Sequence, residues 1–494
     1  MTQDKRRPGM LYARIARPPA HDSRLESLDT SRAESMPGVR VVRDGDLIAA
    51  LAPTPDGAAE AVAAIRATWS ATQMTVDQDS IFDHLMARAP AAQAQDEAGD
   101  PAAAEQRAAH VAALEYRNGY VAHAPMETHT AVAELAGGKA TVWASTQTPF
   151  SARDEVAQVL GLSAEDVRVI TPFVGGGFGG KGQNPQVVEA ARIARLAGAP
   201  VHLEWTREEE FFYDTFMPAA VVKVRSGVSA EGLLVSWDYA VAYAGTRGSE
   251  VIYHVPDRRV AAHGRGWRAA PGSHPFGTGA WRAPGANTNA FARESQIDVM
   301  AAAAGADPLE FRLRNLRDAR MRAVLEAAAA KFGWKPAAEP GAGYGIACTT
   351  DAGTWNALMA KVRVDRRTGQ VKVERVVCAQ DMGLVVNPHG ATLQAEGCIT
   401  MGLGYALSEE LRFQGGDVLD TNFDTYSIPR FSWVPEIEVV FVDTGIAEPH
   451  GGGEPAIVGM GAVIANAIAD ATGARMTRMP MTPARVLEAV AGIQ

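Results

Sequence analysis

A glycine-rich loop is the first part of this sequence whose residue types could do chemistry. Residues 175–180 read Gly-Gly-Gly-Phe-Gly-Gly and are followed by Lys181. The loop lies between a segment typical of a strand, at 167–170, and a helix expected to begin at Pro185. Backbone amides that no side chain covers, close to a helix N-terminus, can bind a phosphate or an oxo group. The loop therefore predicts a site for an anionic or oxo-bearing ligand.

Two nucleotide-binding motifs can be compared with this loop. A Walker A loop needs Ser or Thr after its lysine as a magnesium ligand, but Gly182 stands there, which excludes a nucleotide triphosphatase. The dinucleotide pattern Gly-x-Gly-x-x-Gly is matched at 175–180, and Glu204 ends a predicted strand, where a ribose-binding acid is expected. Five glycines in six positions satisfy that pattern almost automatically, so an NAD-dependent dehydrogenase is kept as the alternative interpretation.

A single carboxylate near the end of the sequence is the best candidate for a general base. Glu454 follows three glycines, residues 451–453, and precedes Pro455, which favours a helix start. The glycines leave room beside the carboxylate for a bulky reaction centre, where the carboxylate can accept a proton. A glutamate that caps its own helix would explain the same pattern.

Histidine and cysteine residues do not form a metal-binding pattern. His123, Glu127 and His129 are residue types found in zinc sites, but Pro125 interrupts the helical spacing that such a site needs. The cysteines contain no Cys-x-x-Cys pair, which disfavours zinc or iron–sulfur binding and favours reduced thiols in a cytoplasmic protein. They are Cys348, Cys378 and Cys398.

The composition is that of a folded chain that binds small molecules or proteins. It has 494 residues, 47% hydrophobic and 21% charged, with a formal net charge of −10. The negative charge disfavours nucleic acid and anionic membranes as partners, and no apolar run reaches the roughly 18 residues of a membrane span. Pro8 and polar residues follow Arg6 and Arg7, so we expect no export signal and a cytoplasmic location, or a periplasmic one by co-export with a partner.

Alternating strand and helix patterns predict an α/β or α+β fold. We expect an α/β unit at 8–80, a linker rich in Ala, Gln, Asp and Glu at 81–110, and larger units at 111–335 and 336–494. Strands are expected at 11–14, 39–42, 141–143, 167–170, 201–205, 362–364, 371–377 and 437–442. Helices are expected at 58–69, after Asn184-Pro185 and Asp307-Pro308, and from Pro455 to Gly473.

Several segments in a fixed order resemble the molybdenum hydroxylase family of xanthine dehydrogenase and aldehyde oxidase. The glycine loop is similar to the family's Gly-Gly-Phe-Gly-Gly-Lys loop, and residues 8–75 resemble its hammerhead domain, which molybdopterin-binding domains follow. Other similar segments stand at 123–127, 143–147, 280–286, 307–310, 387–388, 394–397 and 453–455. The run Trp-Arg-Ala-Pro-Gly at 281–285 most resembles the bacterial isoquinoline 1-oxidoreductase and nicotinate dehydrogenase type.

The resemblance implies a cofactor and a role for each matching residue. The cofactor of the family is molybdenum held by the dithiolene of molybdopterin, here expected as the cytosine dinucleotide form, so no protein side chain binds the metal. Glu454 would take the proton of a hydroxide ligand, hydride would pass to a sulfido ligand, and Gln147 and Phe178 would act beside them. The implied cofactor-binding residues are Gln147, Gly177, Phe178, Gly179, Arg282, Gln394 and Gly453.

Departures from the family pattern imply partner subunits. The pterin-binding segments Gly-Gln-Gly and Gly-Gly-Ser-x-Ser are not found, and neither are cysteines for a pair of [2Fe–2S] clusters or a flavin domain. We therefore expect a second molybdopterin-binding subunit and a small iron–sulfur subunit. Gly182 stands where purine-oxidising members resemble one another in having a carboxylate, which favours an aromatic N-heterocycle or an aldehyde as the small-molecule substrate. A non-catalytic scaffold subunit is the remaining alternative.

Overall fold

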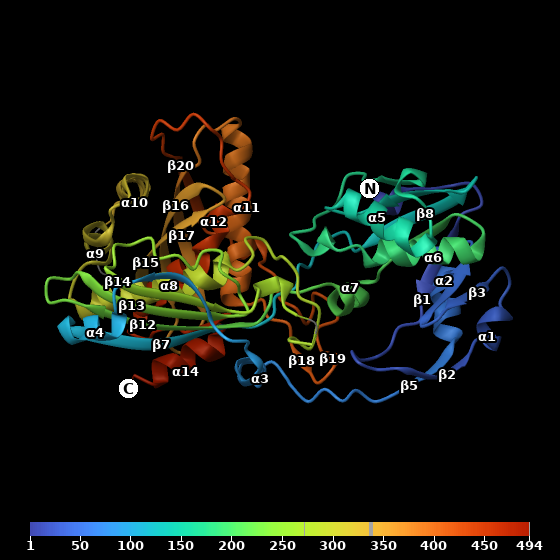
Figure 1. The fold of residues 1–494 in the computed structure, drawn as a ribbon, viewed down its shortest axis with the longest axis horizontal. Coiled ribbons are helices and arrows are strands. Elements are labelled where there is room, and N and C mark those ends of the chain that lie inside the picture. Colours follow the sequence, from blue (N-terminus) through green and yellow to red (C-terminus); the bar gives the residue numbers. More distant parts are fainter. Residues whose placement is uncertain (271, 335–338, 494) are drawn as a thin grey trace.

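The chain folds into two α/β modules that lie side by side along the longest axis of the molecule (Figure 1). The computed structural model describes residues 1–270, 272–334 and 339–493. We call the module that contains the N-terminus the first module and the one that contains the C-terminus the second module. The expected domain boundary at residues 335 and 336 lies outside the described residues.

The first module is built on a mixed seven-stranded sheet with the strand order β10-β9-β8-β11-β1-β4-β3. Its strands are β1 (Leu11–Ile15), β3 (Arg40–Asp44), β4 (Leu47–Ala52), β8 (Thr130–Ala136), β9 (Lys139–Ala144), β10 (Val167–Ile170) and β11 (Val201–Glu204). Helices α2 (Pro55–Ala64), α5 (Pro149–Leu160) and α6 (Pro185–Ala197) pack on this sheet. Smaller elements are α1 (Ser31–Glu34), α7 (Arg207–Tyr213) and the strand pair β2 (Leu25–Asp29) and β5 (Arg66–Trp69).

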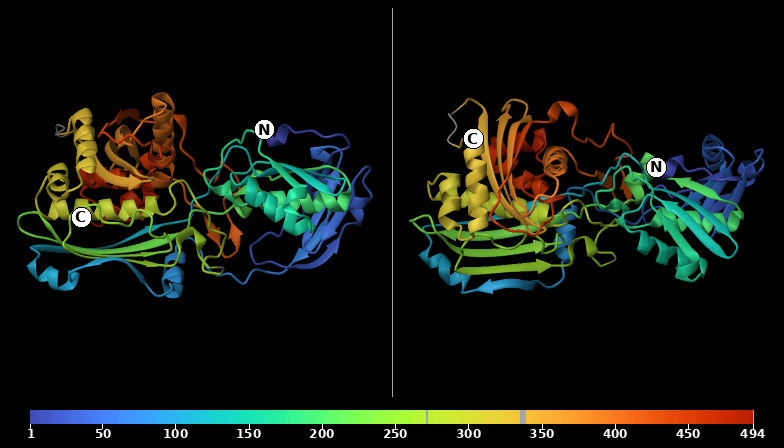
Figure 2. Two further views of the ribbon diagram at one scale, coloured as in Figure 1. Left: turned by 45° about the horizontal axis from the view of Figure 1, so that its top comes forward. Right: turned by 90° about the horizontal axis from the view of Figure 1, so that it is seen from above.

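The second module stacks two sheets with helices between them (Figure 2). The six-stranded sheet contains, in spatial order, β21 (Arg478–Met479), β7 (His110–Asn118), β12 (Ala220–Val228), β13 (Leu234–Ala242), β14 (Asp257–His263) and β6 (Gln93–Ala98). The four-stranded sheet contains β15 (Ala342–Asp351), β16 (Thr354–Val364), β17 (Val371–Asp381) and β20 (Glu436–Phe441).

Two helices form the core between these sheets. Helix α8 (Ala286–Ala303) contacts β7, β12 and β15, and α13 (Met460–Thr472) contacts α8, β15 and β16. Both helices are buried on nearly every side, as a helix enclosed between two layers must be. The other elements are α3 (Ile81–Arg88), α4 (Pro101–Ala104), α9 (Pro308–Asn315), α10 (Ala319–Phe332), α11 (Pro388–Leu407), α12 (Pro455–Val458), α14 (Pro483–Ala491), β18 (Phe413–Gln414) and β19 (Asp417–Val418).

The segment from Pro455 to Thr472 is the one described helical stretch with the length and hydropathy of a membrane span. It consists of α12 and α13, and 83% of it is buried inside the molecule. Its hydrophobicity is therefore explained by its place in the core of the second module.

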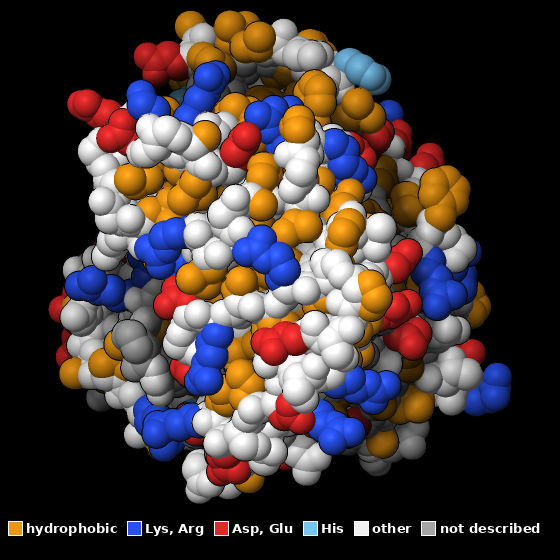
Figure 3. Space-filling view, turned by 90° about the vertical axis from the view of Figure 1, so that its right-hand side faces the viewer, with side chains coloured by type: hydrophobic (Ala, Val, Ile, Leu, Met, Phe, Trp, Pro, Cys, Tyr) orange, Lys and Arg blue, Asp and Glu red, His pale blue; other side chains and the backbone are white. Residues whose placement is uncertain are grey.

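On the face of the first module in Figure 3, basic and acidic side chains are interspersed with hydrophobic ones.

Two local expectations differ from the structure. The segment 81–110 is not a linker, because it carries α3, β6 and α4. Strand β6 pairs with β14 at the edge of the six-stranded sheet and its side chains are mostly exposed, so a polar composition is compatible with a strand there. The helix expected at 58–69 ends at Ala64, because residues 66–69 form β5 and pair with β2.

The expected division of the chain into consecutive domains also differs from the structure. Strands β1, β3 and β4 come from the unit expected at 8–80, and β8 to β11 come from the unit expected at 111–335. All seven strands form one sheet, because β1 pairs in parallel with β11. The first module therefore combines two separate stretches of sequence, with the first strands of the second module between them.

We expect Gly345→Ala to destabilise the second module. A Cβ at Gly345, in β15, would lie 2.0 Å from the carbonyl oxygen of Val463 in α13. Separating strand and helix should lower the free energy of unfolding by about 1–3 kcal/mol, measured by chemical denaturation. The control is Gly182→Ala, whose Cβ would meet nothing within 4 Å. Equal stability of the two variants would contradict the tight contact.

Candidate active site

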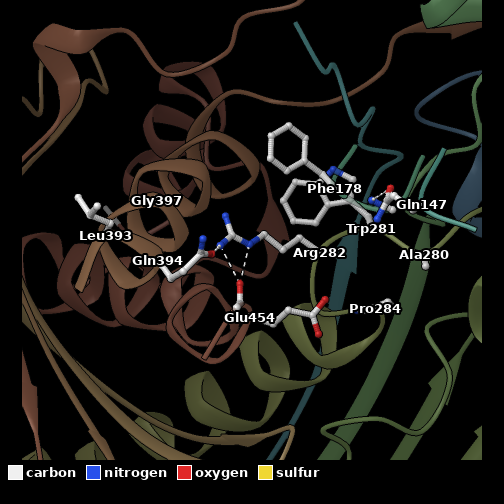
Figure 4. Close-up of a pocket in the computed structure, with 12 residues that line it drawn as sticks. Gln147, Phe178, Ala280, Trp281, Arg282, Pro284, Leu393, Gln394, Gly397 and Glu454 are labelled. Carbon is white, nitrogen blue, oxygen red and sulfur yellow. Dashed lines mark hydrogen bonds between the residues drawn. The ribbon is translucent and has the colours of Figure 1, made fainter. Parts of the chain in front are cut away.

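A cavity of about 490 Å³ is lined by residues of both modules. Figure 4 shows the side chains that converge on it. The first module contributes Gln147, Phe178 and Gly179, and the second contributes residues 280–282, 284, 393, 394, 397, 453 and 454. All the site residues predicted from the sequence line this cavity except Gly177.

The glycine loop meets the second module through a direct backbone contact. A Cβ at Gly179, where φ is +117°, would lie 1.4 Å from the carbonyl oxygen of Ala280, so only glycine fits. The amide of Arg282 donates to the carbonyl oxygen of Phe178 at 2.9 Å. Phe178 itself has a φ of +52°, a conformation that is costly for a residue with a side chain. These contacts fix the loop against residues 280–282.

Gln147 is oriented by the same loop. Its side-chain oxygen accepts a hydrogen bond from the amide of Gly179 at 3.1 Å, so its NH₂ group remains as a donor at the cavity. A Cβ at Gly177 would lie 2.5 Å from that side-chain oxygen. Gly177 thus leaves space for the side chain of Gln147, and it is not among the residues that line the cavity. Its role in binding the cofactor stays a prediction.

Arg282, Gln394 and Gly453 form one hydrogen-bonded group. The guanidinium of Arg282 donates to the carbonyl oxygen of Gly453 from Nε at 2.9 Å and from Nη2 at 2.7 Å. Nη2 also donates to the side-chain oxygen of Gln394 at 3.1 Å, which leaves the NH₂ group of that amide as a donor. Among the described residues, Nη1 has the Met401 sulfur, 3.9 Å away, as its partner.

Glu454 lies at the rim of the cavity, and its carboxylate does not cap its own helix. Glu454 precedes α12, but its side chain makes no capping hydrogen bond. Its Oε1 accepts from the amide of Ala283 at 2.9 Å, and its Oε2 accepts from Nη2 of Arg247 at 2.5 Å. The side chain is 33% exposed. The helix-capping interpretation is therefore wrong, and the carboxylate is turned toward residues 282–284.

Two buried ion pairs, Lys181 with Glu127 and His123 with Asp214, anchor the glycine loop. Lys181 Nζ donates to the carboxylate and the carbonyl of Glu127 at 3.1 and 2.8 Å, and burial lowers the pKa of Lys181 against the opposing effect of Glu127. His123 lies between the carboxylate of Asp214 and the carbonyl of Ala280, at 2.8 and 2.9 Å. Burial alone would lower the pKa of His123, but these acceptors raise it above its ordinary value.

The histidines and the glutamate considered for zinc have three separate partners. Glu127 pairs with Lys181 and His123 with Asp214, whereas His129 lies 2.9 Å from Glu210. No group of His, Cys, Asp and Glu side chains in the described part of the chain is arranged to hold a metal ion. Their role in the structure is to anchor the loop and its neighbours.

Arg247 and Asp351 are functional candidates that the sequence did not indicate. Arg247 pairs with Glu454 and also with Asp351, through two hydrogen bonds of 2.7 Å. Neither residue belongs to a recognisable motif, and Arg247 and Glu454 stand 207 positions apart. Only the tertiary structure brings them together.

The strand arrangement argues against the NAD-binding alternative. In a dinucleotide-binding unit, the strand before the glycine loop and the strand after the helix belong to one βαβ unit of a parallel sheet. Here β10 precedes the loop and β11 follows α6, but β9 and β8 lie between them. Strand β11 pairs antiparallel with β8. Glu204, at the end of β11, is not among the residues that line the cavity.

Sequence comparisons identify the family of the chain. Two family models described as molybdopterin cofactor-binding domains match residues 85–316 and 287–435. The chain is 29% identical to one subunit of nicotinate dehydrogenase from Pseudomonas putida over 99% of its length, and 30% identical to the beta subunit of isoquinoline 1-oxidoreductase from Brevundimonas diminuta over 97%. The chain thus belongs to the molybdopterin-binding subunits of the molybdenum hydroxylase family of oxidoreductases. It spans 45% and 65% of the lengths of these two relatives.

Solved structures share the fold over the whole chain. Quinoline 2-oxidoreductase from Pseudomonas putida 86 superimposes with a TM-score of 0.88 at 16% identity, over 99% of this chain and 95% of that one. CO dehydrogenase from Oligotropha carboxidovorans superimposes with a TM-score of 0.86 at 16% identity, over 100% and 95%. At this level of identity, the likeness concerns the fold alone.

The lining of the cavity fits a molybdopterin cofactor. The NH₂ groups of Gln147 and Gln394 and Nη1 of Arg282 are donors suited to oxo, sulfur and phosphate acceptors. A Cβ at Gly453 would meet nothing within 4 Å, so this glycine borders open space that a bound group can fill. Donors and free space therefore occur together in one cavity.

We expect Gly453→Val to fold normally and to lose cofactor. The added side chain would project into open space at the cavity, so the free energy of unfolding should change by less than about 0.5 kcal/mol. The molybdenum content of the complex purified with its partner subunits should fall several-fold. Elemental analysis measures the content. The control is Gly182→Val, which also adds a side chain into open space but outside the cavity. Full molybdenum content in Gly453→Val would show that the cofactor lies elsewhere.

Proposed function

We propose that this chain is the catalytic subunit of a molybdenum hydroxylase that oxidises an aromatic N-heterocycle or an aldehyde with oxygen derived from water. The observation that carries this proposal is the position of Glu454. Its carboxylate lies at the rim of a cavity lined by hydrogen-bond donors, and two donors from other parts of the chain orient it. The similarity to nicotinate dehydrogenase and isoquinoline 1-oxidoreductase supports the substrate class.

The residues of the cavity divide the work between binding and proton transfer. When bound, molybdenum–molybdopterin, which we propose in its cytosine dinucleotide form, supplies the two-electron oxidation. Gln147, Arg282 and Gln394 would hold it through their N–H donors. Glu454 acts as the general base that takes a proton from the water-derived oxygen. Each of its carboxylate oxygens accepts one hydrogen bond and keeps a lone pair that can accept this proton. The ring of Phe178, 39% exposed, forms an apolar wall against which a flat substrate can lie.

We further propose that the chain works in a heteromer. A second molybdopterin-binding subunit would supply the remaining pterin contacts, and a small iron–sulfur subunit would accept the electrons. Both relatives are named as single subunits of their enzymes, which supports an assembly of several chains. Residues 8–80 would form the hammerhead part of the first module.

We expect Glu454→Gln to lower kcat by about 10²–10⁴-fold, because an amide cannot accept the proton. Gln is similar in size to Glu, so molybdenum content should stay unchanged. Steady-state kinetics with an N-heterocycle or an aldehyde, together with elemental analysis, measures both quantities.

The control for this variant is Glu448→Gln, an exposed carboxylate a few residues earlier, which should keep full activity. Retained activity in Glu454→Gln would remove the residue from its proposed role. An assembly purified with all its subunits that contains neither molybdenum nor pterin would favour the scaffold alternative.

We expect the chain expressed alone to contain little cofactor, because the cavity is open at the junction of the modules. Co-expression with its partner subunits should restore the molybdenum content, measured by elemental analysis of the purified complexes. Full cofactor occupancy of the isolated chain would contradict the proposed sharing of the site.

A further inference from the structure

The proposed base is connected to the core of the second module through one arginine. Arg247 donates from Nε to Oδ1 and from Nη2 to Oδ2 of Asp351, both at 2.7 Å. The same Nη2 donates to Oε2 of Glu454 at 2.5 Å. One guanidinium therefore joins two carboxylates. Its bidentate contact with Asp351 fixes the plane of the guanidinium.

Asp351 makes this arginine rigid. Asp351 is the last residue of β15, and its side chain is 1% exposed, whereas that of Arg247 is 40% exposed. Burial raises the pKa of Asp351 above its ordinary value, against the opposing effect of Arg247. A carboxylate buried in this way needs its cationic partner, because an unpaired buried charge is costly. The pair therefore keeps the guanidinium at the end of the strand.

The loop that carries Arg247 is fixed to α8. The side chain of Asn289, in α8, donates from Nδ2 to the carbonyl oxygens of Gly245 and Arg247, at 2.9 Å each. Asn289 is fully buried. At Gly248, a Cβ would lie 2.9 Å from Cα of Ala286, so the loop rests on the first turn of the helix. Asn289 thus fixes the backbone of Arg247, and Asp351 fixes its side chain.

A second donor reaches Glu454 from the residues just before the same helix. The amide of Ala283 donates to Oε1 of Glu454, and Ala283 has a φ of +62°, which is unfavourable for alanine. An unfavourable backbone angle beside a candidate base is typical of a site where one group must be aimed. Arg247 and Ala283 hold one carboxylate oxygen each.

We propose that Arg247, braced by Asp351, is a positioning residue that fixes the orientation of the Glu454 carboxylate toward the cavity. This inference rests on the proposed function of Glu454 as the base. Without Arg247, the side chain of Glu454 keeps one donor and can rotate about it. Proton transfer requires the acceptor within hydrogen-bond reach, and small displacements at a reacting centre reduce rates strongly. Arg247 acts through Glu454 and need not touch the substrate.

The test compares Arg247→Ala with Arg412→Ala in the complete assembly. Arg412 is a matched control, because it is 48% exposed and pairs at 2.7 Å with the fully buried Asp420, outside the cavity. We expect Arg247→Ala to lower kcat by about 10–100-fold with little change in KM, and Arg412→Ala to leave kcat unchanged. Guanidinium ion added to Arg247→Ala should restore part of kcat, and Arg247→Lys should be intermediate.

A readout independent of turnover is the unfolding midpoint of the complex. We expect the effects of Arg247→Ala and Glu454→Gln on this midpoint to be non-additive, because the first change already removes one partner of the second. The midpoint shifts caused by Arg412→Ala and Glu454→Gln should be additive. Where Arg247→Ala does not assemble, Asp351→Asn replaces it in the test, because Asn has nearly the shape of Asp but no charge to pair with Arg247. This variant should lower kcat while the molybdenum content is retained.

The outcomes separate this inference from the proposed function. Full activity in Glu454→Gln would overturn the proposed function itself. An inactive Glu454→Gln together with a fully active Arg247→Ala, or with additive midpoint shifts, would overturn only the role of Arg247. A lower kcat without guanidinium rescue, equal in the alanine and lysine variants, would also overturn it, because it would point to general structural damage.

Discussion

The site depends first on the close approach of two backbones, at Gly179 in the first module and Ala280 in the second. No side chain fits between them, since a Cβ at Gly179 would lie 1.4 Å from the Ala280 oxygen. The hydrogen bond from the Arg282 amide to Phe178 lies beside this contact. Through these contacts, Gln147 from one module and Arg282 from the other face a single cavity.

Much of the site could be predicted because its residues lie in short motifs with local physical causes. The strand β10 has its predicted bounds, α6 ends at Ala197 and is followed by Gly198 in the left-handed conformation, and Asp307 caps α9 through the amides of Leu309 and Glu310. Family resemblance implies a role for Gln147, the glycines before Glu454 and Pro455 after it indicate a candidate base, and both Gln147 and Glu454 line the cavity. Gly177 shows the limit of this reasoning, since a motif glycine can serve its neighbour without facing the ligand.

The rest could not be predicted, because it depends on contacts between distant parts of the chain. Arg247 stands in no motif, and only the folding of β15 brings Asp351 to it. The polar segment of β6 looks like a linker, because an edge strand with exposed side chains needs no apolar pattern. The parallel pairing of β1 with β11 joins stretches that the sequence presents as separate domains.

That pairing has a consequence for how the protein is made. On the ribosome, β1 emerges long before β11, and the start of the second module emerges between them. At about 5–20 residues per second, the edge of β1 waits on the order of ten seconds or more for its partner. Strand β7 waits longer for β21, which comes near the end of the described chain. During synthesis both modules therefore expose open sheet edges, which are the surfaces that chaperones must protect from aggregation.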